Sequence, residues 1–204
     1  MAKTTLLIAR HGNTFNKGET PTRVGARTDL SLVETGREQA RKLGLHLREN
    51  DLVPHLILTS QLKRTKEMAE IIIDELGLAV ETHPLAIFNE IDYGPDENQT
   101  EDKVLARLGE DALRKWDEDA IVPDGWLVDP EAIARNWINF ANELEVGTTT
   151  LVITSNGIAR FAPHITGNFE TFALNQSIKI STGALCVLER EAQDWVIKDW
   201  NIKP

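Results

Sequence analysis

The feature that most constrains the fold is an alternation of short apolar runs with segments of helical periodicity. β-Branched and apolar runs predict strands at 4–9, 56–60, 79–88 and 148–155. Helical spacing predicts helices at 35–50, 61–77, 101–118 and 130–147, with another from Ile158. The closing stretch, 178–202, predicts two or three strands. Such alternation predicts an α/β three-layer α/β/α sandwich with a mostly parallel sheet.

Several residues mark where the predicted helices begin and end. Thr35 followed by Glu38 predicts a capping box at the start of the first helix. Gly77 is a stop signal for the second helix. Pro130 and Gly147 are placed as the start and end of a later one. These signals support the helical assignments.

The length of 204 residues predicts one domain spanning 1–204. Residues 92–130 are polar, acidic and interrupted by proline and glycine, so we expect an insertion there. Residues 10–34 predict a long loop. A loop of that length in a compact domain is usually functional.

Composition excludes several classes of partner. The chain carries 22 Lys and Arg against 32 Asp and Glu, a formal net charge of −10, which argues against nucleic acid bound through its phosphates. Its single cysteine, Cys186, lies in an apolar run, predicting a buried side chain, no intrachain disulfide and a reducing compartment. The N-terminal apolar run is too short for a signal peptide or a membrane span. We therefore expect a cytoplasmic protein with no membrane partner.

Polar side chains follow three of the predicted strands. The first strand ends in Arg10 and His11, and Arg64 follows the second. The strand at 148–155 leads into a polar group made of Ser155, Asn156 and Gly157. Ligands of parallel sheets bind at the carboxyl ends of the strands, and arginines beside helix N-termini favour phosphate. Neighbouring positive charge would keep His11 neutral, leaving a ring nitrogen as nucleophile.

These residues resemble the histidine phosphatase superfamily, also called phosphoglycerate mutase-like. The likeness is carried by R-H-G at residues 10–12 and by three later segments, "GARTDLSLVETGREQA", "TSQLKRTKEMAE" and "NEIDYGPDEN". These landmarks occur in the family's order, and only 98–130 lacks them. The resemblance implies the family's sandwich fold.

The resemblance also implies roles for the residues around the first strand end. His11 would accept the phosphoryl group and form a phosphohistidine. Arg10 and Arg64 would grip the phosphate, and Asn13 or Thr14 would contact it from the loop. Phosphoryl transfer needs mainly positioning and charge stabilisation, which these groups supply.

A general acid is implied in the segment after the third strand. By the resemblance, Glu90 would protonate the leaving alkoxide and then activate water. Asp92 and Glu97 are alternatives for this acid. The acidic stretch around them predicts repulsion of highly charged leaving groups.

The chain departs from the family where a second histidine is expected. In the family's pattern, H-x-G-x-x-R, this chain has "SNGIAR", with Ser155 at the histidine position and Gly157 and Arg160 in register. A lost preorganised donor of this kind costs roughly 10²–10³ in rate. His83 is a candidate substitute from a neighbouring strand end, whereas His164 lies too far along the chain.

Together these patterns predict a slow phosphatase acting on a small phosphorylated metabolite. The alternative is a non-catalytic phospholigand-binding or regulatory module, and a lesser one is mutase-type phosphotransfer. No histidine pair has metal-ligand spacing, so neither a metal nor another cofactor is expected. Arg23 and Arg27 are candidates to extend the anion site. The sequence leaves the substrate and the oligomeric state open.

Overall fold

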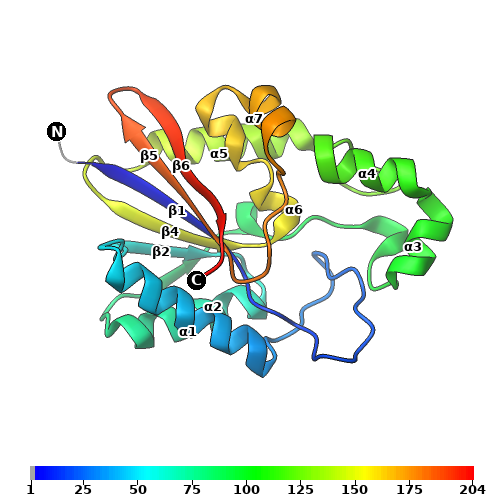
Figure 1. Cartoon of the computed structure of the whole chain (residues 1–204), viewed down its shortest axis with the longest axis horizontal. Helices are drawn as coiled ribbons and strands as arrows, with labels where there is room; N and C mark the ends of the chain where they lie inside the picture. The colour runs from blue at the N-terminus through cyan, green and yellow to red at the C-terminus, as the bar shows by residue number, and fades with distance from the viewer. Residues whose placement is uncertain (1–2) are drawn as a thin grey trace.

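The computed structural model describes residues 3–204, and in them six strands form one mixed sheet in the order β3-β2-β4-β1-β5-β6 (Figure 1). The strands are β1 (Thr4–Arg10), β2 (Leu56–Thr59), β3 (Thr82–Pro84), β4 (Thr149–Thr154), β5 (Leu185–Glu191) and β6 (Asp194–Ile202). The first four are mutually parallel, and β5 and β6 form an antiparallel hairpin beside β1. The prediction of a mostly parallel α/β sheet is confirmed.

The register of the central strands brings their carboxyl ends level with one another. Arg10 of β1 pairs with Thr154 of β4, and Ile153 of β4 pairs with Thr59 of β2. The residues that follow these strands therefore lie at one edge of the sheet, where α/β proteins place their ligands.

Helices cover both faces of this sheet (Figure 1). On one face lie α1 (Glu34–Glu49) and α2 (Lys63–Leu76), and α5 (Pro130–Glu143) lies on the other. Alternate residues of β1 divide between the two cores. Leu7 packs with the α1 and α2 side, and Leu6 and Ile8 pack on the opposite side. A three-layer arrangement follows.

The predicted capping box at the start of α1 is wrong. The helix begins at Glu34, with Val33 as its N-cap and no capping side chain. Backbone contacts fix this start, because Val33 N donates to Asn13 O and Arg37 N donates to Val33 O. Thr35 thus lies in the first turn, where its hydroxyl accepts from Asn13 Nδ2 at 3.4 Å.

Of the other predicted helix boundaries, those at Gly77 and Pro130 are confirmed and the one at Gly147 is wrong. Gly77 ends α2 in the left-handed region at φ 64°, and Pro130 begins α5, as predicted. α5 ends at Glu143 rather than near Gly147, which instead occupies the turn into β4 at φ 85°.

Residues 92–130 form two helices where one was predicted. Gly109, at φ 79°, separates α3 (Glu101–Leu108) from α4 (Glu110–Asp119). Trp116 and Trp126 from this segment are buried in the same core as Trp137. Asp96 ties the segment together, because its carboxylate accepts from Arg107 and from Trp126 Nε1.

After β4 the chain forms three short helical pieces rather than one helix from Ile158. These are α6 (Asn156–Ala159), η3 (Ala162–Thr166) and α7 (Phe169–Asn175), and two further 3₁₀ turns lie at η1 (Ala86–Phe88) and η2 (Gly94–Asp96). Pro163 and Gly167, the latter at φ 72°, interrupt the helical path.

The predicted burial of Cys186 is confirmed. The side chain lies in β5 and is fully buried, which raises the pKa of its thiol to about 12. Across residues 3–204, no helix is both long and apolar enough to cross a membrane.

Candidate functional site

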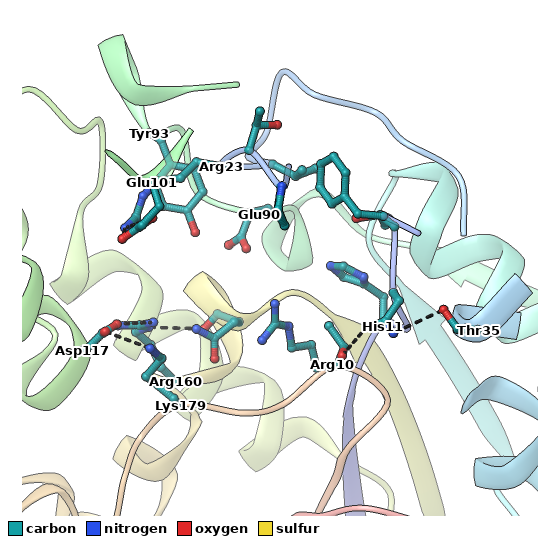
Figure 2. A pocket seen from close by; sticks show the side chains of 18 of the residues that line it. Arg10, His11, Arg23, Thr35, Glu90, Tyr93, Glu101, Asp117, Arg160 and Lys179 are labelled. Atoms are coloured by element: carbon teal, nitrogen blue, oxygen red, sulfur yellow. Dashed lines mark hydrogen bonds and ion pairs between the residues drawn. The ribbon is translucent and has the colours of Figure 1, made fainter. Parts of the chain in front are cut away.

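A cavity of about 650 Å³ opens at the carboxyl edge of the sheet. Its walls come from the loop after β1, the segment around Glu90 and Tyr93, the end of α4, the start of α6 and the loop before β5. Figure 2 shows Arg10 and His11 on one side of this space and Glu90 facing them.

His11 is buried, and its hydrogen bonds determine its protonation pattern. Arg64 Nε lies 3.1 Å from His11 Nε2, and His11 Nδ1 lies 2.8 Å from Gly12 O. A guanidinium N–H only donates, so Nε2 is the acceptor and Nδ1 carries the ring proton. Burial and the charges of Arg64 and Arg10 hold the pKa of His11 well below 6.5. The ring is therefore neutral, with a lone pair at Nε2.

Close backbone packing fixes the His11 loop. A Cβ on Gly12 would lie 2.4 Å from the carbonyl oxygen of Gly36 in α1, so only glycine permits this approach. His11 N donates to Thr154 O, and Gly183 N donates to His11 O. The loop is thus held from three sides.

Arg64 lies deeper than His11 and is fully buried. Besides His11, it donates to the backbone oxygens of Thr28 (2.9 Å) and Gly25 (3.3 Å), and Nη2 lies 3.5 Å from Ser155 Oγ. Its position at the first turn of α2 agrees with the prediction.

Arg10 lines the cavity directly. Its Nη1 donates to Ile180 O at 2.6 Å, and its buried Nε has no hydrogen-bond partner among residues 3–204. Burial lowers the pKa of Arg10 from 12.5. The side chain thus offers an unused donor beside His11.

Glu90 is buried opposite these groups. Its carboxylate accepts from Ile91 N at 2.9 Å and from Gly157 N at 3.3 Å. Burial raises the pKa of Glu90 above 4.5, partly opposed by Arg64 and by these hydrogen bonds. A Cβ on Gly157 would lie 2.2 Å from Glu90 Oε1, so the glycine makes room for the carboxylate.

Asp92 and Glu97, the two alternatives for the general acid, form hydrogen bonds away from the cavity. Asp92 forms a bidentate pair with Arg27 at 3.0 and 3.1 Å. Glu97 accepts from the backbone of Gly25 and Arg27 and from the Thr28 hydroxyl. Neither carboxylate lines the cavity, so the predicted repulsion receives no support from the position of these two residues.

The predicted phosphate-contacting residues of the loop and of α6 divide into two groups. Asn13, Thr14 and Asn156 line the cavity. Ser155 and Gly157 are buried behind it, the first against Arg64 and the second against Glu90. The strand ends therefore meet as expected, but not every residue that follows them reaches the open space.

Neither histidine weighed as a partner for His11 lies in the cavity. His83 is exposed in the edge strand β3. His164 stacks on Phe169, with ring centroids 3.9 Å apart. The predicted role for His83 thus receives no support from its position.

Of the two candidate arginines, Arg23 lines the cavity and Arg27 does not. Sequence reasoning missed other lining residues, namely Tyr93, Glu101, Trp116, Asp117, Lys179 and Thr182. It also missed Gln39, whose side chain accepts from Asn13 N at 2.8 Å and donates to Thr182 O at 3.1 Å. Gln39 belongs to the segment "GARTDLSLVETGREQA" that carries part of the family resemblance, and this segment was the available signal. In the described part of the chain, no three His, Cys, Asp or Glu side chains form a group suited to a metal ion.

Solved structures with a similar fold include two phosphatases. The mycobacterial glucosyl-3-phosphoglycerate phosphatase matches with a TM-score of 0.74 and 19% identity, covering 98% of this chain and 99% of that one. The phosphoserine phosphatase from Entamoeba histolytica, solved with 3-phosphoglyceric acid, matches with a TM-score of 0.76 and 18% identity, covering 98% and 97%. At these identities the likeness concerns the fold.

Curated relatives include 2,3-bisphosphoglycerate-dependent phosphoglycerate mutases. The enzyme of Chelativorans sp. (strain BNC1) is 32% identical over 143 residues, 69% of this chain and 68% of the mutase. That of Parvibaculum lavamentivorans is 32% identical over 120 residues, 58% of this chain and 56% of the mutase. The aligned part spans between about half and two thirds of these enzymes. The model of the histidine phosphatase superfamily (branch 1) matches residues 6–203, and the chain therefore belongs to this superfamily.

Proposed function

We propose that the protein is a phosphatase that hydrolyses a small phosphomonoester through a phosphohistidine on His11. The observation that carries this proposal is the orientation of His11, whose protonated Nδ1 is held by Gly12 O while the lone pair of Nε2 faces Arg64. The superfamily contains both phosphatases and mutases, so the choice between hydrolysis and transfer is part of the proposal.

In the first step, His11 Nε2 attacks phosphorus and the bond to the leaving oxygen breaks. Arg64 Nε, which donates to Nε2 in the free protein, turns its donor to a phosphoryl oxygen. The Arg10 guanidinium, which lines the cavity, donates to another. Glu90, whose pKa is raised above 4.5 by burial, acts in its protonated form and gives its proton to the leaving alkoxide.

In the second step, water attacks the phosphohistidine. The Glu90 carboxylate formed in the first step takes a proton from this water, the P–N bond breaks, and phosphate leaves. Glu90 is then protonated again and His11 is neutral, so the cycle closes without a cofactor.

We also propose that Ser155 occupies the position of the family's second histidine. It directly follows β4 and contacts Arg64, as a residue beside the phosphate would. Its hydroxyl accepts from Arg64 Nη2 at 3.5 Å and is fully buried, and it offers only one neutral O–H donor, so it contributes little to the phosphoryl oxygens. Slow turnover follows.

The test is phosphate release from p-nitrophenyl phosphate and from a panel of alkyl phosphomonoesters, combined with trapping of an acid-labile phosphoenzyme. We expect release from at least one ester and a trapped adduct on His11. Binding of inorganic phosphate with no release from any ester would instead favour the binding module. Transfer to an added alcohol without net release would favour mutase-type chemistry.

Substitution Ser155→His is expected to raise kcat by up to roughly 10² because it restores a charged or strongly polar donor beside the phosphate. Ser155→Asn introduces an amide, which is smaller than the imidazole of histidine. It should therefore give a smaller rise in kcat than Ser155→His. Both rates are measured on variants whose Tm and circular dichroism match the wild type. Unchanged kcat in a folded Ser155→His variant would contradict the assignment of this position.

A further inference from the structure

Arg64 carries a fully buried positive charge, and the four groups that accept hydrogen bonds from it are all neutral. They are the His11 ring, the Ser155 hydroxyl and the backbone oxygens of Gly25 and Thr28. Burying a charge is costly unless its hydrogen bonds are made. The orientation of the Arg64 guanidinium therefore depends on what holds these acceptors in place.

Two of the acceptors belong to one tight turn, residues 25–28. Arg64 Nη2 donates to Gly25 O at 3.3 Å, and Arg64 Nη1 donates to Thr28 O at 2.9 Å. The turn is closed by Thr28 N, which donates to Gly25 O at 3.4 Å. The 25–28 turn thus binds both terminal nitrogens of the guanidinium, while Nε donates to His11 Nε2.

Glu97, a half-buried side chain, binds the donor groups of the same turn. Its Oε1 accepts from Gly25 N at 3.1 Å, from Arg27 N at 2.9 Å and from Thr28 Oγ1 at 2.8 Å. Converging backbone N–H groups of this kind form an anion-binding nest, and here a carboxylate of the chain itself occupies it. A Cβ on Gly25 would lie 2.0 Å from Glu97 Oε2, so glycine is needed for this close approach.

Glu97 also connects the 25–28 turn to the segment that carries Glu90. Its other oxygen, Oε2, accepts from Tyr93 N at 3.2 Å. Figure 2 shows Glu90 and Tyr93 on the same wall of the cavity. One carboxylate therefore joins the wall that carries the proposed general acid to the turn that holds Arg64.

We propose that Glu97 is a positioning residue for the phosphate site, which holds the 25–28 turn so that Arg64 directs its Nε at the phosphoryl group. Glu97 does not line the cavity, so it acts through the turn and the guanidinium rather than on the substrate. The inference rests on the proposed phosphatase function and gives Glu97 a role other than that of the general acid.

Two substitutions test this role in steps. Glu97→Ala removes every acceptor and should lower kcat/KM by roughly 10², the cost of a misplaced group in an active site. Glu97→Gln keeps one acceptor oxygen but loses the charge that strengthens its hydrogen bonds, so a loss of about tenfold is expected. Calorimetric titration with inorganic phosphate should show Kd weakening in the same order. Both variants are compared with the wild type by circular dichroism and Tm.

The leaving group distinguishes positioning from proton donation. An effect carried by Arg64 concerns the phosphoryl oxygens, so Glu97→Gln should lower kcat/KM by the same factor for p-nitrophenyl phosphate and for alkyl phosphates. A general acid matters much less for p-nitrophenolate, which leaves without protonation. If Glu97→Gln spares p-nitrophenyl phosphate, Glu97 is a proton donor and the positioning role is overturned.

A double-mutant cycle tests whether Glu97 acts through Arg64. Arg64→Met removes the guanidinium, so adding Glu97→Gln should then change phosphate affinity and kcat/KM little further. Losses that multiply in the double variant would overturn the proposal. If Arg64→Met does not fold, the ¹⁵N resonance of His11 Nε2 replaces the cycle. It should move in Glu97→Gln because the hydrogen bond from Arg64 Nε weakens, and an unmoved resonance would overturn the proposal.

Glu67→Gln is the matched control. Glu67 is also half-buried and accepts from the backbone of the long loop, at Leu32 N (2.8 Å), but it does not line the cavity. Its loss should leave phosphate affinity and kcat/KM unchanged, because the backbone acceptors of Arg64 lie in the 25–28 turn. An equal loss in Glu67→Gln would mean that any weakening of the loop lowers activity, which contradicts a specific role for Glu97.

The two proposals fail in different ways. Wild-type phosphate affinity and kcat/KM in folded Glu97 variants would overturn the positioning role and leave the phosphatase intact. If the wild type hydrolyses no ester, the phosphatase function fails, and phosphate affinity alone then tests Glu97. If neither Glu97 variant folds, Thr28→Val removes one donor to Glu97 and keeps Thr28 O. It should weaken phosphate binding, and unchanged affinity would overturn the positioning role.

Discussion

Replacing His11 by alanine is expected to lower kcat/KM for every phosphomonoester by roughly 10⁴-fold or more. The variant lacks the Nε2 lone pair that attacks phosphorus in the proposed mechanism, and with it the proposed covalent intermediate. Phosphate release and the acid-labile phosphoenzyme are measured together, and both should disappear.

The control for this variant is His164→Ala. His164 is also partly buried, but it stacks on Phe169 and lies outside the cavity. Its loss should leave kcat/KM unchanged. The His11→Ala protein keeps Arg10 and Arg64, so calorimetry should still detect phosphate binding. Residual turnover equal to wild type in a folded His11→Ala protein would remove the proposed mechanism.

The proximity of Arg10, His11 and Arg64 could be predicted because it depends mainly on the parallel direction of the strands. Parallel strands place their carboxyl ends at one edge, and each of these residues follows or ends such a strand. The apolar runs that give the strands are local features of the sequence. The prediction therefore needed no knowledge of side-chain contacts.

The start of α1 shows where local signals fail. Thr35 and Glu38 match a capping box, but Asn13, from a loop distant in sequence, bonds to Val33 and sets the start one residue before Thr35. Tertiary contacts of this kind outweigh a capping preference of about 1 kcal/mol.

The places of Asp117 and Lys179 in the cavity wall were beyond sequence reasoning for a related reason. Asp117 lies in the last turn of α4, and Lys179 lies in the loop before β5. Their convergence depends on how residues 92–130 pack against the core through Trp116 and Trp126. That segment lacked family landmarks, so no motif indicated which of its many charges would face the cavity.

The choice of Glu90 over its neighbours predicts a second large effect. Glu90→Gln is expected to lower kcat/KM for alkyl phosphates by roughly 10²–10⁴ because the leaving alkoxide then lacks a proton donor. The loss should be much smaller for p-nitrophenyl phosphate, whose phenolate leaves without protonation. Asp92→Asn, which disturbs the pair with Arg27 and the hydrogen bond from Gly94 N, should show no such dependence on the leaving group.

The pH profile of the same variants gives an independent readout. In the wild type the first step needs Glu90 protonated, so kcat/KM should fall as pH rises through its raised pKa, which lies above 4.5. It also needs His11 neutral, and because the pKa of His11 lies well below 6.5, the activity should persist into acidic solution where an ordinary histidine is charged. Glu90→Gln has no such titration and should lose the alkaline limb while keeping the acidic one. If the alkaline limb survives in Glu90→Gln, or if Asp92→Asn removes it instead, Glu90 is not the general acid. The buried Glu90 carboxylate, which accepts from Ile91 N and Gly157 N, then has a structural role only.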